Sequence, residues 1–79
     1  MLNIIAKNVK SKLSRSVRGK IECHATGATI ICDIINNGDI FRYTQKYTQF
    51  EISNGLSSEH LYREIMYFYT QHIKEKFFK

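Results

Sequence analysis

Proline is absent from this 79-residue sequence, and its only cysteines are Cys23 and Cys32. A small secreted domain that relies on disulfides normally carries at least about four cysteines. The sequence therefore argues against a disulfide scaffold, and we expect both cysteines to be reduced thiols.

Long apolar runs are also missing. Asp33 interrupts the most apolar stretch shortly after Ile30 and Ile31, so no run approaches the roughly 20 residues that a membrane-spanning helix needs. The apolar residues at the start precede the first lysines, whereas a secretory signal begins with positive charge. We expect a cytoplasmic protein without a membrane span.

Motifs for catalysis and for cofactor binding are lacking as well. The four glycines stand alone and form no glycine-rich phosphate cradle. Cys23 and His24 are adjacent on an expected strand, so their side chains point to opposite faces and do not converge on a zinc ion. The carboxylates are scattered and suggest no acid–base pair. The sequence thus predicts a protein that is not an enzyme, with no cofactor and no metal.

Size and composition predict a single folded domain over residues 1–79. Apolar residues make up 43% of the chain and charged residues 24%, which is typical of a folded domain. A domain of this size buries only about 60% of the surface that its unfolded chain exposes. Self-association would bury more, so we expect a homo-oligomer, most simply a dimer.

Positive charge is concentrated at the start of the chain. Residues 1–20 contain six basic and no acidic residues, whereas the other 59 contain six basic and seven acidic residues. Apolar residues recur here at intervals of three and four, from Leu2 to Val17, which predicts an amphipathic helix that ends before Gly19. The candidate nucleic-acid contacts are the six basic residues Lys7, Lys10, Lys12, Arg15, Arg18 and Lys20.

This basic segment allows three interpretations. It can be a solvated helix face, a surface that binds nucleic-acid phosphates in a salt-dependent way, or a helix that lies on an anionic membrane. The membrane interpretation requires the helix to leave the core. No cluster of base-reading side chains accompanies the six cations, so any nucleic-acid affinity should be largely independent of sequence.

The turn signal Asn-Asn-Gly-Asp at residues 36–39 predicts a β-hairpin with Asn37 and Gly38 as its two-residue loop. In this register Asp33 faces Arg42, a pair of opposite charges that helps to fix strand pairing. The face of the hairpin that should meet the helices carries Ala28, Ile30, Cys32, Ile34, Phe41, Tyr43 and Tyr47.

Two arrangements fit the residues before this hairpin. If the hairpin continues, Ala25 pairs with Phe50 and Cys23 with Ile52, and a bulge or kink at Gly27 bends both strands. Alternatively, residues 25–28 form a tight turn and the sheet has three strands. We favour the bent hairpin.

A second helix should begin after Ser57, which is a suitable cap and is followed by Glu59 in the first turn. Its apolar stripe covers nearly half of the circumference and consists of Leu61, Tyr62, Ile65, Met66, Phe68, Tyr69, Ile73 and Phe77. Tyr67 and Phe78 project from the polar side, and exposed aromatic residues of this kind are typical of contact surfaces.

In order, these elements predict an α+β fold: helix, strand, strand, helix, with a small antiparallel sheet and both helices packed on one face. The other face of the sheet stays uncovered. The candidate protein-interface residues are Ile31, Ile35 and Ile40 on that face, together with Tyr67 and Phe78. We therefore expect a non-enzymatic protein-binding module that acts as a homodimer, with nucleic-acid binding through the basic helix as the alternative.

The basic first helix, the turn at residues 36–39 and the segment from Gly55 to the C-terminus resemble small uncharacterised proteins encoded by phages and prophages of AT-rich Gram-positive bacteria. That resemblance implies a non-enzymatic role, typically the binding of a host or phage protein to inhibit or redirect it. With three strands, the order of elements would also be similar to a double-stranded-RNA-binding domain. That family has a lysine cluster at the start of its last helix, where this sequence has Ser57, Ser58, Glu59 and His60.

Overall fold

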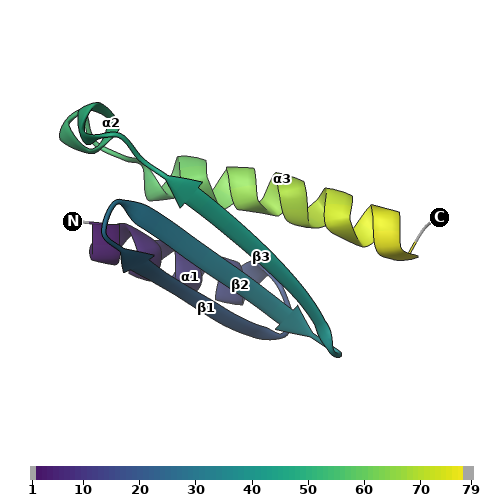
Figure 1. Ribbon diagram of the computed structural model, residues 1–79. Helices are drawn as coiled ribbons and strands as arrows, with labels where there is room; N and C mark the ends of the chain where they lie inside the picture. Colours follow the sequence, from purple (N-terminus) through teal and green to yellow (C-terminus); the bar gives the residue numbers. More distant parts are fainter. Residues whose placement is uncertain (1, 78–79) are drawn as a thin grey trace.

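A three-stranded antiparallel sheet forms the middle of the fold, with the helices α1 and α3 on one of its faces (Figure 1). The computed structural model describes residues 2–77, with the side chain of residue 77 excepted. The elements are α1 (Leu2–Ser16), β1 (Lys20–Thr26), β2 (Thr29–Asn36), β3 (Asp39–Lys46), α2 (Gln49–Ser53) and α3 (Ser58–Phe77). This arrangement confirms the predicted α+β fold.

Helix α1 lies across the sheet with its apolar stripe toward β1 and β2. Its buried residues recur at intervals of three and four, as predicted, and are Leu2, Ile5, Ala6, Val9 and Leu13. They meet Ile30, Cys32 and Ile34 of β2, which are almost completely buried. Together with Ile21 of β1 and the buried side of the last helix, they form one core on this face of the sheet.

The hairpin of β2 and β3 has the predicted register. Asn36 pairs with Asp39, and Asp33 pairs with Arg42. The φ angles of Asn37 and Gly38 are +50° and +81°, and positive values at both loop residues are the signature of a type I′ turn. The local turn chemistry accordingly determines the register of the whole hairpin.

The favoured bent hairpin is wrong, and the three-stranded alternative is correct. Gly27 does not form a bulge: it has a φ of +61° and occupies the first position of a two-residue turn between β1 and β2. A glycine with positive φ at this position is typical of a type II′ turn. Because the chain reverses here, Cys23 pairs with Cys32 and Ala25 with Ile30.

The last residues that the bent hairpin would have placed in its second strand, among them Phe50 and Ile52, form the short helix α2 instead. Thr48 caps this helix, its side chain accepting a hydrogen bond from the backbone N–H of Glu51, whose side chain accepts one from the N–H of Thr48. This reciprocal arrangement is a capping box. The chain therefore leaves the sheet after Lys46, and Phe50 and Ile52 are helical.

Helix α3 begins at the predicted position. The side chain of Ser57 accepts a hydrogen bond of 3.2 Å from the backbone N–H of His60, as expected of a cap. Leu61, Ile65 and Tyr69 are buried at intervals of four residues against α1 and the sheet. One side of α3 is thus held in the core, while its other side faces away from the molecule.

Candidate interaction surfaces

The six predicted cationic residues differ in their surroundings. Lys7, Lys10, Arg15 and Arg18 are exposed, and within residues 2–77 none of their side chains lies in an ion pair with a carboxylate. Lys12 and Lys20 each have an acidic neighbour. We call the four exposed residues Lys7, Lys10, Arg15 and Arg18 the cationic surface.

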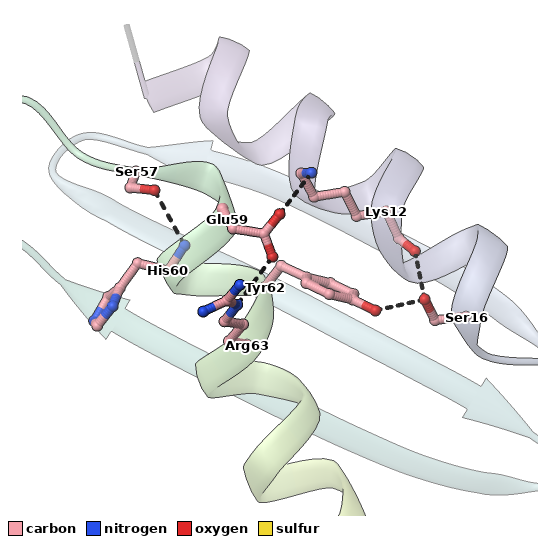
Figure 2. A network of polar contacts seen from close by, with 7 residues as sticks. All are labelled: Lys12, Ser16, Ser57, Glu59, His60, Tyr62 and Arg63. Atoms are coloured by element: carbon pink, nitrogen blue, oxygen red, sulfur yellow. Dashed lines mark hydrogen bonds and ion pairs between the residues drawn. The ribbon is translucent and has the colours of Figure 1, made fainter.

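Lys12 connects α1 to α3. Its Nζ lies 3.0 Å from Oε1 of Glu59, and the hydroxyl groups of Ser16 and Tyr62 lie 2.5 Å apart one turn further along (Figure 2). The ammonium group of Lys12 lowers the pKa of Glu59, and Arg63 contributes to the same shift. Lys12 therefore links the two helices. Because the carboxylate of Glu59 partly neutralises its charge, Lys12 attracts an anionic ligand less strongly.

Lys20 is also partly neutralised, because its Nζ lies 3.5 Å from Oε1 of Glu22 on the same strand. Both side chains are largely exposed, so this pair contributes little to stability. Of the six sequence-predicted cations, the structure therefore leaves four with unopposed charge among its described residues.

The uncovered face of the sheet carries the predicted isoleucines. Ile40 is 63% exposed, while Ile31 and Ile35 are partly buried by neighbouring side chains. Ile35 pairs with Ile40 near the turn, but the row formed by Glu22, Asp33 and Arg42 separates this pair from Ile31. The isoleucines do not form one continuous apolar patch.

Asp33 lies in the middle of this face and is nevertheless buried. The guanidinium group of Arg42 donates two hydrogen bonds to its carboxylate, at 2.8 and 3.0 Å. These hydrogen bonds lower the pKa of Asp33, and burial of the carboxylate offsets only part of that effect. The guanidinium group of Arg42 thus satisfies the charge of a buried carboxylate.

A pair of adjacent aromatic rings stands out on α3. Tyr67 is 60% exposed and Phe68 is 46% exposed, with their ring centroids 5.3 Å apart in an edge-to-face arrangement. Phe68 also stacks on Tyr43 of β3 at 5.9 Å. The two rings border a shallow depression that is lined by His60, Arg63, Glu64, Tyr67 and Phe68. We call these five residues the outer α3 surface.

The sequence predicted the exposure of Tyr67 but placed Phe68 in the apolar stripe that packs on the core. Phe68 lies at the margin of that stripe, beyond the edge strand β3, so the narrow sheet covers it only in part. The signal that could have indicated this is the width of the stripe, which exceeds what three strands can bury. The other predicted residue, Phe78, lies outside the described residues.

Glu64 is held at the edge of the depression. The hydroxyl group of Tyr43 donates a hydrogen bond to Oε1 of Glu64, and Oε2 lies 3.6 Å from Nε2 of His60. Burial and the carboxylate of Glu64 both raise the pKa of Tyr43, burial being the larger cause. Tyr43 therefore stays protonated and fixes the Glu64 side chain as a donor.

A second polar cluster joins the far end of α3 to the β2–β3 turn. Asp39 lies 2.5 Å from Nζ of Lys76 and 2.9 Å from Nε2 of His72. Both hydrogen bonds lower the pKa of Asp39, and the one from Lys76 has the larger effect. The His72 ring packs on Phe41 at 5.2 Å. The cluster fixes α3 to the β2–β3 turn.

The two cysteines are directly opposite each other on β1 and β2, as free thiols. A hydrogen bond between them lowers the pKa of Cys23 and, together with burial, raises that of Cys32. In the described part of the chain, no group of three His, Cys, Asp or Glu side chains converges as metal ligands would. Nor does any helix within residues 2–77 have the length and apolarity to cross a membrane.

Comparison with known proteins finds no matching family model, no matching curated sequence and no matching solved structure.

Removing the charge of Asp33 tests the account of the uncovered sheet face. Because Arg42 lowers its pKa, the ionised carboxylate stabilises the fold above the unfolded pKa of about 3.9, and this contribution is lost as pH falls through the lower folded value. Wild type should therefore melt above Asp33→Asn at about pH 6, and the difference should shrink toward about pH 2.

The variant Arg42→Gln is the matched control, because it removes the cause of the shift while Asp33 remains. The melting temperature of Arg42→Gln should therefore depend on pH as weakly as that of Asp33→Asn. A difference between wild type and Asp33→Asn that stays constant across the titration would contradict the role given to this pair.

Proposed function

We propose that this chain is a non-enzymatic protein-binding module and that its partner binds at the outer α3 surface. The single observation that carries the proposal is the exposed Tyr67–Phe68 pair beside the depression on α3. Aromatic residues are enriched at the centres of protein interfaces, where they bury a large area with few rotatable bonds.

The surroundings of this pair support the proposal. His60, Arg63 and Glu64 border the rings with polar and charged groups of both signs, which is the usual arrangement of an apolar centre and a polar rim. The opposite side of α3 is anchored through Leu61 and Ile65 in the core. A partner therefore meets a surface that is already ordered, and association loses little conformational entropy.

The cationic surface supports a second candidate function, the binding of nucleic acid. Its four side chains are exposed on α1 and at its C-terminal end, without carboxylate partners among the described residues. Contacts of lysine and arginine with phosphates give salt-dependent affinity without sequence preference. The three-stranded order also resembles a double-stranded-RNA-binding domain, but α3 opens with Glu59, whose charge is opposite to the lysines of that family.

A photo-crosslinking amino acid at position 67 tests the protein-binding proposal in cells that express the full chain. We expect polypeptide adducts that survive nuclease treatment, because the partner lies against this surface. The same amino acid at position 50 is the matched control, since Phe50 is 76% exposed on α2, outside the proposed surface. Equal adducts at both positions, or adducts that nuclease removes, would show that the outer α3 surface is not a protein-binding site.

The cationic surface is tested separately by replacing Lys7, Lys10, Arg15 and Arg18 with Gln. If wild type binds DNA through about four phosphate contacts, the logarithm of its affinity should fall with the logarithm of salt with a slope of about −3 to −4. The four substitutions should abolish binding. Replacing Lys46, which is exposed on β3, should leave most of it. Binding that survives the four substitutions would exclude this surface.

A further inference from the structure

We infer that the partner at the outer α3 surface is a second copy of this chain, whose α3 helix lies antiparallel to the first across a twofold axis at the level of Tyr69. This inference rests on the proposed function, because it names the partner of the same surface. Two features of α3 carry it, the spacing of its exposed residues and the order of their charges. A comparison with the cationic surface and with the uncovered sheet face supports it.

The exposed side of α3 has the spacing of a helix–helix seam. His60, Glu64, Tyr67, Gln71 and Lys74 follow one another at intervals of four and three residues, and all are exposed or partly exposed. Residues with an average spacing of 3.5 stay in contact with a second helix along its length. The residues buried in the core lie on the opposite side of the same helix, so the seam is open to a partner.

The charges along this seam complement themselves in an antiparallel pair. Glu64 and Lys74 lie five residues before and five residues after Tyr69, and Tyr67 and Gln71 are likewise equidistant from it. A twofold axis at Tyr69 therefore brings Glu64 of each copy opposite Lys74 of the other, and Tyr67 opposite Gln71. A parallel pair would instead align Glu64 with Glu64 and Lys74 with Lys74, which like-charge repulsion disfavours.

The geometry of the side chains suits this contact. Tyr43 holds Glu64 in place through one carboxylate oxygen, so the second oxygen stays at the surface near His60. Within the seam, Tyr67 packs edge to face with Phe68, and the two rings present a preformed apolar ridge. The rest of the seam is polar, so we expect a dimer that dissociates on dilution and not an obligate one.

The two other surfaces do not fit a second copy. The cationic surface would place like charges against each other. The uncovered sheet face would bury the Asp33–Arg42 pair, which separates Ile31 from Ile35 and Ile40. Among the residues that the structure describes, only those on the outer side of α3 offer both an aromatic ridge and charges of both signs in a self-complementary order.

Two charge reversals test this arrangement in the full chain. Lys74→Glu and Glu64→Lys should each weaken self-association by about tenfold or more, because two ion pairs per dimer become repulsive. Mixing the two variants should restore association close to that of wild type, since every reversed charge then faces an opposite one. Lys7→Glu, an exposed lysine on α1 with the same change in charge, should leave association unchanged. Sedimentation velocity over a concentration series measures all four.

The outcomes separate this inference from the proposed function. A wild-type chain that stays monomeric, variants that associate like wild type, or a mixture that gains nothing would each overturn the second copy as partner. If position 67 still crosslinks to a different protein, the proposed function survives that failure; without any protein adduct, both fail. If circular dichroism shows that Glu64→Lys does not fold, Glu64→Gln replaces it. Glu64→Gln must then associate with Lys74→Glu more strongly than Lys74→Glu associates with itself.

Discussion

The contact between the apolar stripe of α1 and the central strand β2 is the interaction on which the rest of the structure depends. Val9 and Leu13 are completely buried in the same cluster as Ile30 and Ile34, and within residues 2–77 the sheet is covered only on the face where α1 and α3 lie. A chain of this size can build only one such layer. The single core places both long helices on one face and determines which residues remain outside it.

This one-sided core explains the differences among the three remaining surfaces. The uncovered sheet face must tolerate water, so charged residues separate its isoleucines, and Asp33 is satisfied by Arg42. The outward side of α1 carries charge of one sign. The apolar stripe of α3 is wider than the narrow sheet can cover, so Phe68 stays exposed beside Tyr67, which projects from the polar side of the helix. Tyr67 and Phe68 are adjacent on α3, whereas the other large apolar residues that are exposed, Ile4, Ile40 and Phe50, each lie on a different element.

Local signals in the sequence were sufficient for much of the fold. The residues that cap α3, the stripe of α1 and the Asn37–Gly38 turn each act within a few positions of the chain, and the structure confirms them. Gly27 was ambiguous because a glycine suits both a bulge and a tight turn. The choice depends on whether Cys23 pairs with Cys32 across a tight turn or with Ile52 across the longer hairpin, and the glycine alone does not decide between them.

The candidate surfaces were harder to predict, because they depend on contacts between distant residues. Lys12 looked equivalent to Lys7, but it lies beside Glu59, which is 47 positions further along the chain. Phe68 looked like a core residue, and its exposure follows from the width of the sheet. The order of Glu64, Tyr67, Gln71 and Lys74 is visible in the sequence, yet it acquires a meaning only once the buried side of α3 is known.

The central claim is that this small core leaves the outer side of α3 as the contact surface of the protein. The most direct measurement is a dilution series followed by NMR, with the backbone and aromatic signals of every residue assigned. The account predicts that signals of residues 60–75 on the outer side of α3 shift together with concentration, while those of Ile35, Ile40 and the cationic surface do not. Shifts confined to the uncovered sheet face, or no shifts at any concentration, would contradict it.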